Sequence, residues 1–200
     1  MPKIRHKNDF YETPALLTKE LLARVNISGK ILEPCAGNSA ISKALMQYPH
    51  NGRIVLESDL TWEDKRYYCV DATIREFWTY WRSHFNKCYP EQGLQWVVTN
   101  PPFSKAHEIL PLAFEHCNVG VAFLLRSTYS EPCKNRRDWL IQNADHLRYR
   151  IDINPRPRFR AEKGSDMATV TWFVWLKDWS WKTKLNIDPP FQFITDWRTL

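Results

Sequence analysis

Short apolar runs alternate along the chain with stretches in which apolar residues recur at helical spacing. Apolar runs that end at turn residues predict strands, and apolar residues three or four positions apart predict helices. The predicted strands are residues 30–33, 53–56, 67–70, 96–99, 119–125, 147–153 and 168–176. The first predicted helix starts at residue 14 and ends near residues 26–29, and the second runs from the turn at 34–39 to residue 46. The other predicted helices are residues 74–87, 105–117 and 134–143. This alternation indicates an α/β fold with a doubly wound, mainly parallel sheet.

Two of the predicted helices have a clear apolar stripe, which predicts the face that each buries. In the first helix, Thr13 is a candidate N-cap and Pro14 is suited to the first helical position. Its stripe contains Leu16, Leu17, Leu21, Leu22 and Val25. In the helix at 74–87 the stripe is aromatic and is better explained by core packing than by a binding surface; its members are Ile74, Phe77, Trp78, Trp81 and Phe85.

Size and composition predict one globular domain over residues 1–200. The chain has 200 residues, of which 44% are hydrophobic and 14% aromatic, which is enough to form a core. No run of about 18 apolar residues suggests a membrane span, and the first residues lack the apolar stretch of a signal peptide. We therefore expect an intracellular, cytoplasmic protein with a basic N-terminal segment at 1–13 and a C-terminal tail at 185–200.

Cysteine and histidine spacing gives no reason to expect a metal site. The five cysteines contain no CxxC pair, and the six histidines show no spacing typical of metal ligands. We expect reduced thiols and no metal. The formal net charge of +6 and the pI near 9.1 favour an anionic partner, of which nucleic acid is the commonest.

The stretch Asn100-Pro101-Pro102-Phe103 follows the apolar strand at 96–99. Consecutive prolines end the strand and stiffen the turn, and they bias the preceding residues toward extended geometry. The Asn100 amide oxygen and the Pro101 carbonyl can then accept both hydrogens of an exocyclic amine, while Phe103 offers a flat ring for stacking. The same four residues are also compatible with an ordinary turn at the end of a strand.

A second turn of small residues, at 34–39, lies between the strand at 30–33 and the helix that follows it. Such a strand–turn–helix unit offers backbone N–H groups and room for close ligand approach. Further along, Glu57 and Asp59 follow the strand at 53–56, where doubly wound folds place a carboxylate that binds ribose hydroxyls. Both acids are equally compatible with a solvated surface loop.

The two turns together resemble the amino-methyltransferases, which use S-adenosyl-L-methionine to methylate adenine N6, cytosine N4 or glutamine nitrogen. Asn100-Pro101-Pro102-Phe103 resembles motif IV of that family, and the sequence EPCAGN at 33–38 resembles motif I. Ser39 departs from the family, where many members have another glycine. The order of the motifs is similar to that of the small phage and prophage DNA adenine methyltransferases. The resemblance implies a Rossmann-like, seven-stranded sheet with a terminal antiparallel hairpin.

The resemblance also assigns site residues. Asn100, Pro101, Pro102 and Phe103 would be catalytic, and Asp59, with Glu57 as the second choice, would bind the cofactor ribose. Asp71 would accept from the cofactor adenine amine, and Gly37 would lie against the methionine end. The complete predicted set of cofactor residues is Tyr11, Thr13, Glu33, Cys35, Ala36, Gly37, Asn38, Glu57, Asp59, Asp71, Ala72 and Asn100.

If the last two predicted strands form the hairpin, the basic loop at 154–167 projects on the cofactor side of the sheet. It would then be placed to hold a phosphate backbone, although a solvated basic turn explains its composition equally well. The predicted nucleic-acid-binding residues are Lys105, Arg126, Arg156, Arg158, Arg160 and Lys163. We expect DNA rather than RNA as the partner, and the sequence indicates no oligomeric state.

Three other functions remain open at this point. RNA adenine methylation is one, because no residue is seen to recognise a 2′-hydroxyl. Protein-glutamine methylation is another, although that group typically has Tyr where this chain has Phe103. The third is a non-catalytic cofactor-binding subunit. Since little of the chain is left for a separate recognition region, we expect a short or relaxed target sequence.

Overall fold

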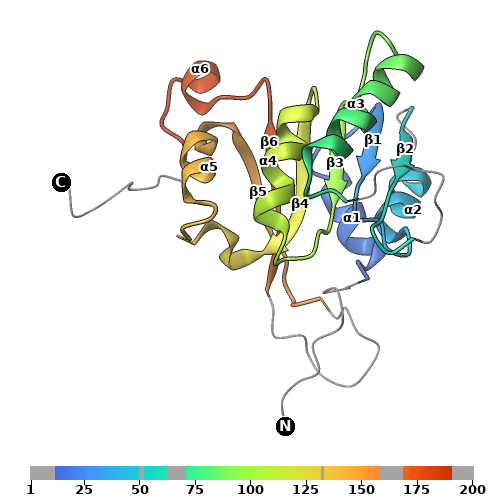
Figure 1. The fold of residues 1–200 in the computed structure, drawn as a ribbon. Coiled ribbons are helices and arrows are strands. Elements are labelled where there is room, and N and C mark those ends of the chain that lie inside the picture. The colour runs from blue at the N-terminus through green and yellow to red at the C-terminus, as the bar shows by residue number, and fades with distance from the viewer. Residues whose placement is uncertain (1–11, 50–51, 63–70, 132, 158–168, 191–200) are drawn as a thin grey trace.

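The computed structural model describes residues 12–49, 52–62, 71–131, 133–157 and 169–190 (Figure 1). Its strands are β1 (Lys30–Glu33), β2 (Ile54–Glu57), β3 (Trp96–Thr99), β4 (Gly120–Arg126), β5 (Leu147–Asp152) and β6 (Val170–Leu176). Its helices are α1 (Ala15–Leu22), α2 (Ala40–Gln47), α3 (Arg75–Cys88), α4 (Ala106–His116), α5 (Arg137–Gln142) and α6 (Trp181–Leu185). Two 3₁₀ turns, η1 (Ser127–Ser130) and η2 (Ala144–His146), flank α5.

These strands form one mixed sheet in the order β2-β1-β3-β4-β6-β5. The pairs β1–β2, β1–β3 and β3–β4 are parallel, whereas β6 is antiparallel to both of its neighbours. The α/β, Rossmann-like fold and the closing antiparallel hairpin are confirmed. The described residues contribute six strands to the sheet. The strand predicted at 67–70 lies outside the described residues.

Helices cover both faces of this sheet, because alternate residues of each strand enter two different cores. Helices α3, α4 and α5 pack against the face formed by Val97, Phe123 and Phe173. Helices α1 and α2 pack against the face formed by Trp96, Leu124 and Trp172. A doubly wound arrangement results, with both faces of β3, β4 and β6 buried.

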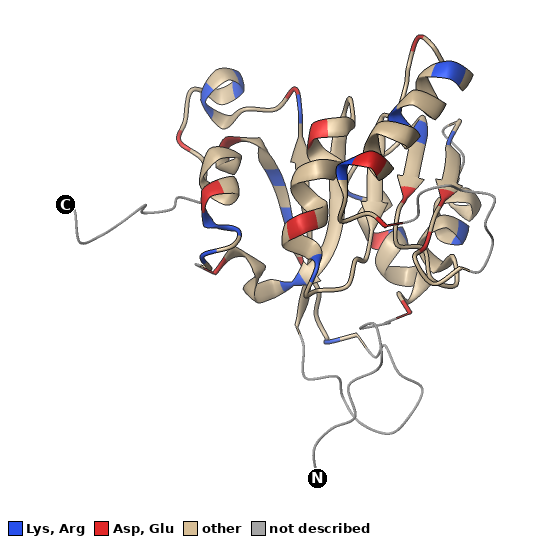
Figure 2. Ribbon diagram, in the orientation of Figure 1, with Lys and Arg blue, Asp and Glu red and all other residues tan. Residues whose placement is uncertain are grey.

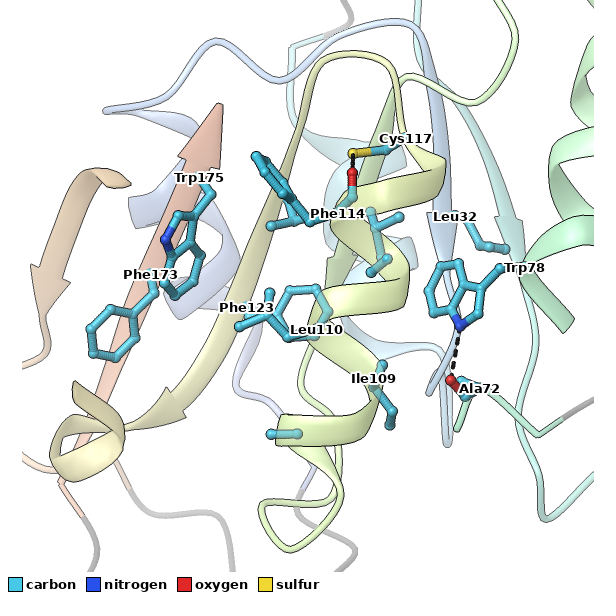
Figure 3. Close-up of a cluster of buried hydrophobic side chains, with 14 of the residues drawn as sticks. Leu32, Ala72, Trp78, Ile109, Leu110, Phe114, Cys117, Phe123, Phe173 and Trp175 are labelled. Atoms are coloured by element: carbon cyan, nitrogen blue, oxygen red, sulfur yellow. Dashed lines mark hydrogen bonds between the residues drawn. The ribbon is translucent and has the colours of Figure 1, made fainter. Parts of the chain in front are cut away.

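The core under α3 and α4 is rich in aromatic rings (Figure 3). Phe173 and Trp175 of β6 stack at 5.8 Å between ring centroids, and the predicted aromatic stripe of α3 is buried from Phe77 to Phe85. Trp78 is fully buried, and its indole N–H donates to the Ala72 carbonyl at 2.9 Å. This bond anchors the segment that carries Asp71 to the start of α3.

Some sequence predictions about the helices are wrong. Leu16 is 69% exposed and Ile74 is 42% exposed, so neither belongs to its apolar stripe. Leu17 packs into the core instead of Leu16, because residues adjacent in sequence lie about 100° apart around a helix. Ile74 precedes α3 as its N-cap in extended geometry. The structure also has a short helix that the sequence did not predict, α6, which lies almost entirely before the tail at 185–200; Ser180 caps it by accepting from the Thr183 N–H at 3.0 Å.

Candidate functional site

The two predicted motifs meet at the carboxyl edge of the sheet. From β1 the chain crosses to β2 on one side, whereas β3 pairs with β1 on the other side, with Leu32 opposite Val97. The order of strands therefore reverses between β1 and β3, and doubly wound folds bind ligands in the crevice outside such a reversal. The turn after Glu33 and the turn after Thr99 both open into this region.

Gly37 is held through both of its backbone polar groups. Its φ of 54° is in the left-handed region, which favours glycine. The Gly37 N–H donates to Asp59 Oδ2 at 2.8 Å, and the Gly37 carbonyl accepts from Trp62 Nε1 at 2.8 Å. The turn after β1 is thus fixed by two residues that follow β2. We did not predict Trp62 from the sequence, because nothing marks it among ten tryptophans.

The Asp59 carboxylate already accepts three hydrogen bonds from nearby residues. Besides Gly37, it accepts from the Thr61 N–H at 2.8 Å and from the Thr61 hydroxyl at 2.6 Å, both at Oδ1. Glu57 lies opposite Glu33 at the end of the β1–β2 pair, and its Oε2 accepts from the Ser39 hydroxyl at 3.0 Å. Glu57 therefore keeps more acceptor capacity for a ligand than Asp59 does.

Ser39, where the resemblance leads one to expect glycine, has a φ of 65°. A side chain in this region costs roughly 1–2 kcal/mol relative to glycine. The Ser39 hydroxyl offsets part of that cost through its bond to Glu57. Ser39 thus connects the start of α2 to the end of β2.

Glu33 points into the protein, toward the first turn of α2. It is 1% exposed, and its Oε2 accepts from the Ser42 N–H at 2.8 Å and from the Ser42 hydroxyl. Burial raises the pKa of Glu33 to about 8; the Ser42 bonds oppose this rise, while the charges of Glu57 and Asp59 add to it. Glu33 is therefore mainly protonated at neutral pH when the three carboxyl groups have no cation near them.

The remaining residues of the first turn differ in exposure. Burial, with a smaller effect from the Asp59 charge, raises the pKa of the Cys35 thiol, so this thiol stays protonated and is a poor nucleophile. Ala36 is buried, and its N–H donates to the Ser58 carbonyl at 3.0 Å. Asn38 is exposed, and its carbonyl accepts from Lys43 Nζ at 2.9 Å.

The second turn carries Asn100, which is bound by a residue from the start of the chain. Asn100 Nδ2 donates to the Thr13 hydroxyl at 3.0 Å, and Thr13 is buried. The predicted capping role of Thr13 is wrong, because Pro14 occupies the N-cap position of α1 and the helix has no side-chain cap. The hydroxyl orients the Asn100 amide instead. Pro101 is buried, and the Pro102 carbonyl accepts from the Lys105 N–H at 2.8 Å.

Phe103 and Arg126 lie together at this edge. Phe103 is half-buried and packs against the core under α1 and α2. Arg126 is the last residue of β4 and is exposed, and its guanidinium carbon lies 5.3 Å from the centroid of the Phe103 ring. This distance is within the range of a cation–π contact. Two residues predicted separately, one for stacking and one for nucleic acid, are thus in contact.

Asp71 lies in the turn that precedes α3, four residues before Arg75. Its Oδ1 accepts from the Thr73 N–H at 2.9 Å and from the Thr73 hydroxyl at 2.7 Å. The following residue, Ala72, is buried and bonded to Trp78. Asp71 is therefore held in a fixed orientation by its own turn and by the aromatic core.

Charge is unevenly distributed along the carboxyl edge (Figure 2). Figure 2 shows acidic residues at the ends of β1 and β2, where Glu33 and Glu57 are located. Lys105 is exposed and pairs with Glu108 at 2.8 Å, which raises the pKa of Lys105. Arg156 is exposed beyond the end of β5. The other predicted contacts lie outside the described residues: Tyr11, Arg158, Arg160 and Lys163.

Within the described residues, no three His, Cys, Asp or Glu side chains are grouped so that they could hold a metal ion. None of the helices in this part of the chain has the length and apolar character needed to cross a membrane.

Comparisons with known proteins give distant structural likenesses. No protein-family model and no curated protein matches the chain. Among solved structures, the tRNA methyltransferase TrmI from Aquifex aeolicus is 12% identical, with a TM-score of 0.41 over 85% of this chain and 71% of that one. A SAM-dependent O-methyltransferase from Thermotoga maritima is also 12% identical, with a TM-score of 0.41 over 87% of this chain and 68% of that one.

Proposed function

We propose that this chain transfers a methyl group from S-adenosyl-L-methionine to the N6 amine of adenine in DNA. The observation that supports this most is the Asn100 amide, which Thr13 orients at the carboxyl end of β3. That amide lies on the turn next to the Gly37 turn and on the same turn as Phe103. An oriented amide, a glycine turn and an aromatic ring are the groups that methylation of a planar amine requires.

The residues around Gly37 are compatible with S-adenosyl-L-methionine. The left-handed glycine allows close approach of a ligand to the backbone, and its peptide is already fixed by Asp59 and Trp62. The charges of Glu57 and Asp59 add to the rise in the pKa of the buried Glu33, and a ligand with cationic groups near these two carboxylates would oppose that rise. We assign Glu57 to bind the ribose hydroxyls of the cofactor. Asp59 holds the turn instead, because its oxygens already accept hydrogen bonds from Gly37 and Thr61.

The acceptor amine would be held by Asn100 and Pro101. Since Asn100 Nδ2 donates to Thr13, the amide oxygen Oδ1 lies on the other branch and accepts one amine hydrogen. The Pro101 carbonyl accepts the second. These two bonds favour a more tetrahedral amine nitrogen, whose lone pair is then available for reaction. The nitrogen would gain the methyl group as the methyl–sulfur bond breaks, and the methylated amine, which is then cationic, would release one proton to water. S-adenosyl-L-methionine, when bound, supplies an electrophilic methyl group on a sulfonium centre.

The protonation states near the site favour direct transfer to the amine. The Cys35 thiol has a raised pKa, which argues against attack by a thiolate on the substrate. Glu33 accepts a hydrogen bond from Ser42 inside the protein, so it is not placed to act as a general base. Orientation of the amine next to the methyl donor would then provide much of the rate enhancement.

Adenine is favoured over a glutamine side chain for two reasons. Phe103 can stack on a planar base, whereas an aliphatic carboxamide gains less from such a ring. The net charge of +6 also suits a polyanion. In duplex DNA the target base would have to be flipped out of the helix to reach Asn100.

The test is to incubate the purified protein with labelled S-adenosyl-L-methionine and, separately, with adenine-containing DNA or RNA. After digestion, the modified nucleosides are identified by mass spectrometry. The proposal expects N6-methyldeoxyadenosine that is absent with Asn100→Ala. Methyladenosine formed only in RNA would establish the RNA alternative. Cofactor binding without any methylated nucleoside would contradict the proposal and favour a protein substrate or a non-catalytic role.

A further inference from the structure

We infer that the Arg126 guanidinium occupies the stacking position on Phe103 when no target base is bound. A base that stacks there displaces the guanidinium, and this displacement makes the site selective for substrates that carry a phosphate. This inference rests on the proposed function, because it assumes that a planar amine stacks on Phe103. It adds a mechanism by which nucleic acid is chosen over a free nucleoside or a glutamine side chain.

The geometry places the guanidinium where a base would stack. Phe103 packs against the core under α1 and α2, so that core covers part of the ring. The Arg126 guanidinium lies over the ring at 5.3 Å from its centroid. A base stacked on Phe103 in the same place needs a similar separation, so the base and the guanidinium cannot occupy that position together.

The displaced guanidinium would remain at the site with its charge available. Among the described residues, no carboxylate forms an ion pair with Arg126, whereas Lys105, two residues after Phe103, is paired with Glu108 at 2.8 Å. Arg126 is exposed, and its place at the end of β4 keeps it at the carboxyl edge of the sheet. An arginine fork matches the oxygens of a phosphate, so the backbone of the target strand is a suitable new partner.

The strengths of the two Arg126 contacts, with the Phe103 ring and with a phosphate, indicate which substrates bind better. An exposed cation–π contact is worth a factor of roughly two to five in an equilibrium constant. A charge-assisted hydrogen bond is worth roughly tenfold or more. A nucleotide replaces the weaker contact with the stronger one. A nucleoside or a glutamine side chain breaks the first contact and cannot form the second, so it binds less well than Phe103 alone would allow.

The experiment compares Arg126→Ala, Arg126→Lys and the wild-type protein. Binding of a fluorescein-labelled, adenine-containing oligodeoxynucleotide is measured by anisotropy over a series of salt concentrations. Methyl transfer is measured on the same oligodeoxynucleotide and on free deoxyadenosine. The control is Arg82→Ala, which removes an exposed arginine from the middle of α3, away from both turns.

With Arg126→Ala we expect oligodeoxynucleotide binding to weaken by about tenfold and the salt slope to fall by roughly 0.7–0.9. Transfer to free deoxyadenosine should stay constant or rise by up to about fivefold, because the cation–π contact no longer competes. Arg126→Lys should keep the salt slope, since it keeps the charge. Arg82→Ala should match the wild type in both assays.

An unchanged salt slope in Arg126→Ala would overturn the inference, as would an equal loss of transfer on the oligodeoxynucleotide and on deoxyadenosine. The salt slope decides the matter even if deoxyadenosine is not methylated. If the proposed function is wrong, the outcome differs: the wild-type protein binds the oligodeoxynucleotide but forms no methyladenine. The binding data would then still measure the contact between Arg126 and phosphate.

Discussion

The Thr13 hydroxyl accepts a hydrogen bond from Asn100 Nδ2 at 3.0 Å, across 87 positions of sequence. Thr13 precedes α1 and Asn100 follows β3, so this bond connects the start of the described chain to the carboxyl end of the central strand. It decides which branch of the Asn100 amide faces the acceptor. The orientation of the proposed catalytic amide therefore depends on a residue outside its own turn.

Thr13→Val should reduce methyl transfer by about tenfold, because valine has the shape of threonine but cannot accept from Asn100. Thr13→Ser should restore most of the rate, since it keeps the hydroxyl. The measurement is the single-turnover rate on DNA at saturating cofactor. If Thr13→Ser is as slow as Thr13→Val, packing of the threonine methyl group would be the cause instead.

Asn100→Ala and Phe103→Ala should each lower the transfer rate by a factor of about 100 or more, as expected for loss of an oriented transition-state contact. The affinity for S-adenosyl-L-methionine, measured by calorimetry, should change little. Neither side chain holds the Gly37 turn, because the hydrogen bonds of the Gly37 backbone go to Asp59 and Trp62. Equal losses of cofactor affinity and rate would show that the roles are wrongly assigned.

Trp62→Phe should weaken cofactor binding by roughly two- to tenfold, since the ring is kept but the bond to the Gly37 carbonyl is lost. Its matched control is Trp181→Phe. Trp181 also donates its indole N–H to a backbone carbonyl, that of Leu147 at 2.8 Å, but it does so at α6. Both variants should lose similar stability in urea unfolding, and only Trp62→Phe should change the cofactor affinity.

Ser39→Ala should lower the free energy of unfolding by about 1 kcal/mol, because it loses the bond to Glu57 and keeps the unfavourable φ of 65°. Ser39→Gly loses the same bond but removes the steric cost, so it should be more stable than Ser39→Ala by about 1 kcal/mol. Chemical denaturation of the three proteins measures both differences. Equal stability of the two variants would mean that the φ of Ser39 carries no cost.

Glu33→Gln should remove a pH dependence of stability. The folded-state pKa of Glu33 is raised to about 8 from an ordinary value of 4.5, so the folded protein holds a proton that the unfolded chain has released. The free energy of unfolding of the wild type should therefore fall, relative to Glu33→Gln, as pH rises from about 4.5 to about 8, and level off above that. Urea unfolding at several pH values checks this. A constant difference between the two proteins across that window would refute the raised pKa.

Strand positions were predictable because short apolar runs end at residues that cannot continue a strand. Residues 30–33 and 96–99 were predicted with the bounds that β1 and β3 have, and the latter strand ends directly before Asn100 and two prolines. The location of the two turns at the same edge of the sheet then follows from general rules of parallel sheets. Helix ends were less predictable: α5 begins at Arg137, three residues after the predicted start, because residues 134–136 form a turn.

Side-chain partners across long sequence distances were not predictable. A threonine before a proline is typical of a helix start, so the sequence favoured capping for Thr13, whereas its partner is Asn100. Glu57 and Asp59 are both acidic residues at or just after the end of β2, so the sequence does not separate their roles. Only the hydrogen bonds of Asp59 with Gly37 and Thr61 distinguish the two. The contact of Arg126 with Phe103 likewise depends on how β4 lies beside β3.

The position of β6 has a consequence for synthesis on the ribosome. This strand is among the last elements in sequence, yet it pairs along its length with β4 and also with β5. Until Val170–Leu176 has left the exit tunnel, the β4 edge has no partner on that side, and six of its seven residues are ones that the finished protein buries. An unpaired apolar edge invites pairing between chains. Until β6 inserts, the nascent protein therefore exposes an edge that is prone to aggregation, and insertion of this strand covers it.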